Sequence, residues 1–101
     1  MHARIATFEG ESRDRLDESI EANRRQIEAG LASPPEGLED VKEVWMLVDR
    51  ESGRSIDLTL FETEEGLRKG DETLNALSPA DPQGRRTSVG LYEVAFRIER
   101  A

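Results

Sequence analysis

Cysteine is absent from the 101-residue chain. Its absence excludes disulfide bonds, thiolate nucleophiles and zinc or iron–sulfur sites held by cysteine. Histidine occurs once, as His2, so a transition-metal site built from several histidines is excluded as well. A side chain so close to a terminus is poorly fixed, and we expect no catalytic role for His2.

Positive charge is in short supply, with 14 basic against 22 acidic residues and a formal net charge of −8. Nucleic acids and anionic membranes are both bound through clustered cations, so neither is an expected partner. No window approaches the roughly 18 apolar residues of a membrane span. The segment that begins "MHARIATFEG" lacks the apolar run of a signal peptide, and the expected location is the cytoplasm.

The chain is also lean in apolar residues, because hydrophobic and charged residues each make up 36%. Its length is typical of one domain, and we expect a single domain over residues 1–101. A domain of this size buries only about 60–65% of its unfolded surface, so its own core is modest.

Alternating β-forming residues predict a first strand over residues 3–9. A helix is expected over residues 13–29, with Ser12 as its N-terminal cap and Gly30 as its C-terminal stop. Asn23 lies on the apolar stripe of this helix. The other members of the stripe are Leu16, Ile20, Ile27 and Leu31.

The segment of residues 44–63 predicts a β-hairpin with its turn over residues 50–53. With that turn, the large apolar residues of the two strands oppose each other in pairs. The pairs are Trp45 with Leu58 and Leu47 with Ile56.

A second helix is expected after Thr63, which is a suitable cap. Residues 78–86 read as a proline- and glycine-rich loop that ends in Arg85 and Arg86. These two arginines could attract an anionic ligand to a pocket mouth, or pair with surface carboxylates. The last strand is predicted over residues 87–99, on an alternation of Tyr92, Val94, Phe96 and Ile98.

The resulting order, β-α-β-β-α-β, is typical of the α+β ferredoxin-like fold, an antiparallel four-stranded sheet with two helices on one face. The strand over residues 44–48 is apolar on both of its sides, yet helices cover only one face. We expect a second copy to cover the other face in a two-fold homodimer. The alternative is that these are isolated exposed apolar residues, which are ordinary.

Three segments, "ARIATFEG", "VWMLVDRESGRSIDLTLFETEEGLR" and "SVGLYEVAF", resemble the dimeric α/β-barrel superfamily, specifically its antibiotic-biosynthesis-monooxygenase-like domains. The resemblance implies a ferredoxin-like protomer, a face-to-face dimer and a ligand pocket between helices and sheet. Members of the family include cofactor-free oxygenases of aromatic polyketides and haem-degrading enzymes.

The haem-degrading members use a histidine on the second helix, a tryptophan, and an asparagine on the first strand. This chain has no histidine beyond His2 and no asparagine in residues 3–9, so Trp45 is a partial match alone. We therefore expect no cofactor and no metal.

Trp45, Tyr92 and Asn23 are the candidates for the ligand pocket. Trp45 could stack on an aromatic ligand, Tyr92 could donate a hydrogen bond to a carbonyl or enolate, and Asn23 could orient a substrate. Each has a packing alternative: a core tryptophan, a sheet tyrosine whose hydroxyl reaches water, and an asparagine at the edge of its stripe.

Two functions follow from these alternatives. The first is a cofactor-independent monooxygenase-like enzyme acting on a small aromatic or enolisable compound. The second is a non-catalytic dimer that binds a small ligand or a partner. A cavity of roughly 300 Å³ or more with convergent polar groups would favour the enzyme.

Overall fold

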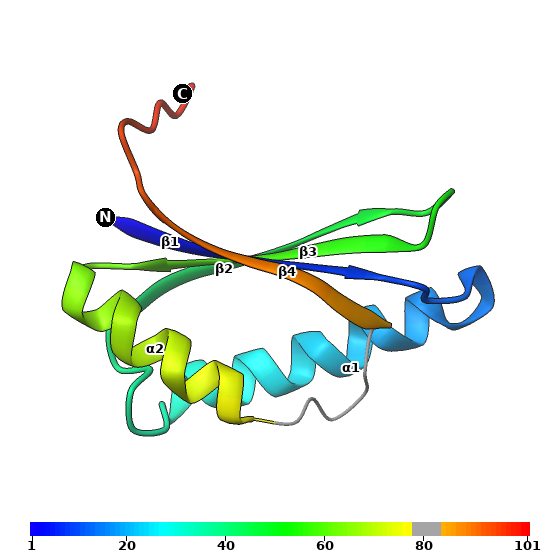
Figure 1. Ribbon diagram of the computed structural model, residues 1–101, viewed down its shortest axis with the longest axis horizontal. Helices are drawn as coiled ribbons and strands as arrows, with labels where there is room; N and C mark the ends of the chain where they lie inside the picture. The colour runs from blue at the N-terminus through cyan, green and yellow to red at the C-terminus, as the bar shows by residue number, and fades with distance from the viewer. Residues whose placement is uncertain (78–83) are drawn as a thin grey trace.

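A computed structural model of the protein describes residues 1–77 and 84–101. Its elements are β1 (His2–Glu9), α1 (Arg13–Ala32), β2 (Val41–Asp49), β3 (Arg54–Phe61), α2 (Glu64–Ala76) and β4 (Arg85–Glu93). The four strands form one antiparallel sheet in the order β2-β3-β1-β4. Both helices lie against the same face of this sheet (Figure 1). The ferredoxin-like prediction is confirmed.

The β2–β3 hairpin has the predicted register, with Trp45 opposite Leu58 and Leu47 opposite Ile56. Its turn closes through Gly53, whose backbone N–H donates to the Asp49 carbonyl at 2.9 Å. Gly53 has a φ of 73°, a conformation that glycine adopts without strain.

Helix α2 begins as predicted, because the Thr63 hydroxyl accepts a hydrogen bond from the Gly66 backbone N–H at 3.0 Å. Helix α1 does not stop at Gly30 as predicted but continues to Ala32. A single glycine costs a helix only about 1 kcal/mol, whereas the residue before a proline is disfavoured in helical geometry, and Ser33 precedes Pro34. Within the described part of the chain, no helix has the length and apolar character needed to cross a membrane.

The two faces of the sheet can be told apart through Arg4, whose side chain contacts α2. Because strand side chains alternate, the neighbours of Arg4 point away from the helices, and the strand pairing extends that side across the sheet. We call this side the apolar outer face. Its apolar members are Ala3, Ile5, Trp45, Leu47, Ile56, Leu58, Leu60 and Tyr92, and the pairing also places Thr7, Glu43, Ser88 and Gly90 on this side.

Strand β4 differs from its prediction at both ends. It begins at Arg85, so Arg85 and Arg86 belong to the strand, while residues 78–83 of the predicted loop lie outside the described residues. It ends at Glu93, so the prediction of a strand through residue 99 is wrong. The physical reason lies in the strand pairing, which ends where Glu93 lies opposite His2, the first residue of β1.

Candidate functional site

The three predicted pocket residues do not lie together. Trp45 and Tyr92 belong to the apolar outer face, on the two edge strands of the sheet, whereas Asn23 belongs to α1 on the helix side. Three strand spacings of about 4.8 Å put Trp45 and Tyr92 about 14 Å apart across the sheet. A ligand role for each of them remains a prediction, but one protomer does not gather them into one pocket.

The surroundings of the three residues differ, because Asn23 is buried whereas Trp45 and Tyr92 are about half exposed. Asn23 is 7% exposed, and its side-chain amide donates to the Ser19 carbonyl at 2.9 Å. The Tyr92 ring lies so close to Gly90 that a β-carbon there would collide with it. Trp45 is 52% exposed. Among the described residues, no buried side-chain nitrogen or oxygen lacks a hydrogen-bond partner.

A groove of about 370 Å³ lies between α1 and the edge strand β2. It forms where the apolar stripe of α1 faces the helix-side residues of β2. Most of its lining is apolar and only partly buried, because β2 has no further strand beside it. The lining residues are Ile20, Arg24, Ile27, Glu28, Leu31, Val44 and Met46.

Charged side chains stand at the rim of this groove. Arg24 forms ion pairs with Glu21 at 2.8 Å and with Glu28 at 3.6 Å, all three residues on α1. The hydrogen bond from Arg24 lowers the pKa of the Glu21 carboxyl, and the same contact raises the pKa of the Arg24 guanidinium. The groove therefore combines an apolar floor with the ion pair of Arg24 and Glu28 at its edge, and the apolar floor suits an apolar or aromatic compound.

A second arrangement lies between the sheet and α2, and the sequence analysis missed it. Arg4 is 5% exposed, its Nε lies 2.9 Å from Asp71 Oδ1, and its Nη2 donates to Asn75 Oδ1 at 3.0 Å. Asn75 Oδ1 also accepts from Arg86 Nη1 at 2.7 Å. Asp71 and Asn75 are one helical turn apart on α2, which is the one hint that the sequence offered.

We call Arg4, Asp71, Asn75 and Arg86 the α2 polar cluster. A buried cation is tolerated only with hydrogen-bonded partners, and this cluster supplies them from one helix. The cluster contains two guanidiniums and one carboxylate, and Asp71 pairs with Arg4. Asn75 Oδ1 accepts from Arg4 of β1 and from Arg86 of β4, and so connects the two strands. The arrangement fastens α2 to the sheet. Within the described residues, Arg86 has the Asn75 amide as a partner, and its attraction of an anionic ligand remains a prediction.

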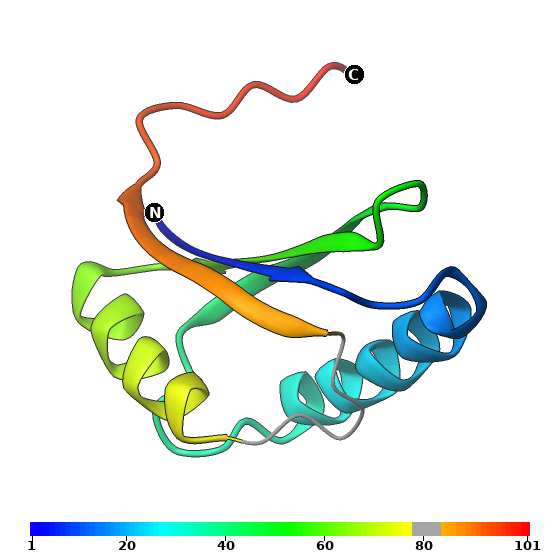
Figure 2. The same cartoon turned by 45° about the vertical axis from the view of Figure 1, so that its right-hand side comes forward.

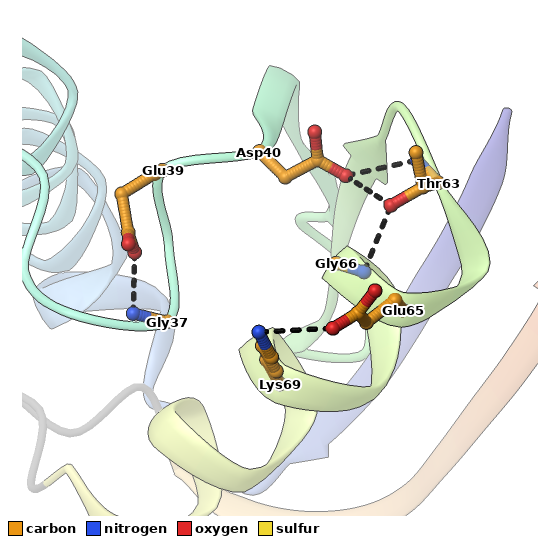
Figure 3. A pocket seen from close by; sticks show the side chains of 7 residues that line it. All are labelled: Gly37, Glu39, Asp40, Thr63, Glu65, Gly66 and Lys69. Atoms are coloured by element: carbon orange, nitrogen blue, oxygen red, sulfur yellow. Dashed lines mark hydrogen bonds and ion pairs between the residues drawn. The ribbon is translucent and has the colours of Figure 1, made fainter.

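A smaller pocket of about 230 Å³ lies at the N-terminal end of α2, against the loop that precedes β2 (Figure 3). Its lining residues are Gly37, Glu39, Asp40, Thr63, Glu65, Gly66 and Lys69. Asp40 Oδ2 accepts from both the backbone N–H and the hydroxyl of Thr63, each at 2.8 Å. The backbone hydrogen bond from Thr63 is the main reason why the pKa of Asp40 is lowered.

This pocket is explained by helix capping. Asp40 holds Thr63, and Thr63 in turn holds the Gly66 N–H, so the first turn of α2 is satisfied by side chains (Figure 3). Lys69 at the edge is paired with Glu65 at 3.0 Å. Asp40, Thr63 and Lys69 of this pocket thus already have hydrogen-bond or ion-pair partners within the pocket.

No protein-family model matches the chain. No curated protein matches it either. Among solved structures, it is similar to the crystal structure of a point mutant of MhuD with two manganese protoporphyrin IX molecules bound per active site. The similarity has a TM-score of 0.60 at 17% sequence identity and covers 99% of this chain and 100% of that one. Identity this low shows the fold alone, and the fold that the resemblance implied is confirmed.

The residues of this chain do not fit a haem. Haem iron is held by histidine, cysteine, methionine or tyrosine side chains. The α1–β2 groove offers Met46 alone among these types, and α2 carries no histidine. His2 lies on β1, opposite Phe61 and Glu93. Within residues 1–77 and 84–101, no three histidine, cysteine, aspartate or glutamate side chains are grouped to hold a metal ion.

Proposed function

We propose that the protein is a homodimer that binds a small apolar or aromatic compound in the groove between α1 and β2. The groove carries this proposal, because its volume of about 370 Å³ lies in the usual range for ligand pockets, about 300–1,000 Å³. Five apolar side chains from the helix and the strand line it. Its place between helices and sheet is also the one that the family resemblance implies.

The apolar outer face supports the homodimer. Trp45, Leu47 and Tyr92 are 52%, 46% and 55% exposed, and they lie on the same side of one sheet. A contiguous apolar surface of this kind marks an association site in a small protein. A two-fold axis lets the same face cover itself, and Trp45 and Tyr92 then serve the dimer. The cytoplasm stays the location that the sequence predicts.

A second candidate is a cofactor-independent monooxygenase-like activity on an enolisable compound. The likeness in fold to a structure described with an active site favours it. In this case the apolar groove would exclude water, Glu28 would accept the acidic proton of the substrate, and Arg24 would stabilise the resulting anion. The substrate anion would itself react with dioxygen.

Ligand binding can be tested with one pair of variants on α1. Ile27→Glu places a carboxylate in the groove, whereas Ala29→Glu adds the same group to an exposed position of the same helix. We expect compounds that raise the melting temperature of the wild type to lose this effect in Ile27→Glu and keep it in Ala29→Glu. Melting without ligand checks that both variants fold. Equal binding by both would place the site elsewhere.

Oxygen consumption measured with the compounds that bind then separates the two candidates. Uptake that Ile27→Glu abolishes supports the oxygenase. Binding without any uptake contradicts the oxygenase and leaves the binding function standing.

A further inference from the structure

The chain continues beyond β4 as an extended segment, residues 94–101, which we call the C-terminal tail. It leaves β4 and passes over the side of the sheet opposite the helices, where the apolar outer face lies (Figure 2). Two contacts tie it to its own protomer: Val94 N–H donates to the Met1 carbonyl at 2.9 Å, and Arg97 pairs with Glu43 at 2.8 Å.

The tail exposes two of its largest side chains. Phe96 is 80% exposed and Ile98 is 83% exposed, more than any other large apolar side chain in the described part of the chain. The two residues alternate with Arg97, the pattern of a strand with one apolar side. Within residues 1–77 and 84–101, no strand is paired with it, because the pairing of β4 with β1 ends at Glu93 opposite His2.

We propose that the C-terminal tail of each protomer packs on the partner protomer, with Phe96 and Ile98 against the rim of the partner's apolar outer face. This inference rests on the proposed homodimer and adds the element that completes its interface. A second copy of this chain is the occupant, because a two-fold axis brings each outer face, with its tail, onto the other.

The size of the sheet shows why a tail is needed. Strands of eight or nine residues and four strands side by side give a face of about 26 by 19 Å, or about 500 Å² per protomer. Two such faces bury about 1,000 Å², which is the lower limit for a specific interface. An aromatic side chain alone adds about 150–250 Å² when buried. Two tails therefore bring the interface into the usual range.

The charges on this side of the sheet agree with such a contact. A charged residue, Glu43, lies on this side of the sheet, opposite Leu60. Arg97 neutralises Glu43 of β2 at the border of this face, so the pair removes a lone carboxylate from the contact area. This matters because two copies that each carry a net charge of −8 repel one another at a distance. The tail is also long enough, since its residues extended span about 26 Å.

The experiment compares three full-length variants with the wild type by sedimentation over a concentration series. Phe96→Ser with Ile98→Ser removes the apolar side chains of the tail, while Arg100→Ser alters the same tail without touching them or the ion pairs of Arg97. Trp45→Ser alters the outer face itself. We expect the dimer dissociation constant to rise at least tenfold in the first and third variants and less than twofold in the second.

A cross-link decides whether the tail contacts its own protomer or the partner. The chain has no cysteine, so Ile98→Cys offers a single attachment point for a photoreactive maleimide. Dimers re-equilibrated from equal amounts of ¹⁴N- and ¹⁵N-labelled protein are irradiated and digested. We expect mixed-isotope cross-links from the tail to peptides of the outer face. Cross-links within one isotope only would mean that the tail folds back on its own sheet, and would overturn the inference.

The outcomes separate this inference from the proposed dimer. A dimer that Trp45→Ser weakens and the tail variant leaves unchanged overturns the role of the tail and keeps the homodimer. A wild type that sediments as a monomer of 11.4 kDa at micromolar concentration overturns both. Ligand binding in the α1–β2 groove is measured separately and is affected by neither result.

Discussion

Arg4 and Asp71 form an ion pair of 2.9 Å that connects the inner strand β1 to α2, with side chains only 7% and 23% exposed. An apolar pair would be the ordinary choice at such a position. An ion pair fixes α2 in one orientation, because a guanidinium accepts partners only along its N–H directions. The α2 half of the helix layer is thereby held by directional contacts.

Breaking this pair on one side should destabilise the fold. Asp71→Ala leaves Arg4 buried with Asn75 as its remaining partner, and we expect a loss of about 2–3 kcal/mol in the free energy of unfolding, tempered by the partial exposure of Asp71. Urea denaturation measures it. The double variant Arg4→Met with Asp71→Leu should recover most of the loss, because no unpaired charge remains. Glu21→Ala, in an exposed pair on α1, should change stability by no more than about 0.5 kcal/mol.

Glycine positions on the two helices should respond in opposite ways to alanine. A β-carbon at Gly70 would collide with the Phe61 ring, whereas nothing lies within 4 Å of one at Gly30. We expect Gly70→Ala to destabilise by about 1–3 kcal/mol through overpacking, and Gly30→Ala to stabilise by about 0.5–1 kcal/mol through helix propensity. Thermal and urea unfolding of the two variants measure the difference. A stabilised Gly70→Ala would mean that α2 is not packed against Phe61.

The Asp40 cap should make part of the stability depend on pH in the acid range. Its pKa is lowered in the folded protein, so the carboxylate stabilises the fold above its unfolded pKa of about 3.9. That contribution is lost as the pH falls through the lower, folded pKa. Urea unfolding of wild type and Asp40→Asn should therefore differ at pH 7, and the difference should shrink as the pH falls through the folded pKa of Asp40. Asp14→Asn, on the exposed surface of α1, serves as the control.

Arg24 should discriminate between acidic and neutral ligands of the α1–β2 groove. Arg24 lines the groove while its neighbour Arg25 does not, although both pair with Glu21. For an aromatic acid that binds the wild type, we expect Arg24→Ala to weaken binding about two- to fivefold, the range of an exposed ion pair. Arg25→Ala should leave it unchanged, and a neutral analogue should be insensitive to both. Calorimetric titration measures these affinities. Equal losses in both variants would point to a general charge effect.

The hairpin and the start of α2 could be predicted because their signals are local. Gly53 and the opposed pair of Trp45 and Leu58 fix one register, and Thr63 lies directly before the helix that it caps. The order of elements then selected the fold. Most of the sheet was therefore predictable from short stretches of sequence.

The candidate site was not predictable in the same way, because alternation along a strand separates two faces without saying which one the helices cover. Trp45 was expected in the pocket and lies on the outer face, while its neighbours Val44 and Met46 line the groove. Arg4 and Asp71 are 67 positions apart, and only the packing of α2 brings them together. Residues 94–99 show a strand pattern, but among the described residues no strand pairs with them.

The helix that forms one wall of the α1–β2 groove is more deeply buried at its start than at its end. Near its start, α1 is secured by the fully buried Leu16 and Ser19, the latter bonded to Glu11 at 2.9 Å, while its final turns carry the half-exposed Leu31. Amide hydrogens should therefore exchange with solvent slowly around the buried Ser19 and quickly in the last turn of α1. Because α1 is anchored better at its start than at its end, the end of the groove near Leu31 should adapt to ligands of different size more readily than the end near Ile20.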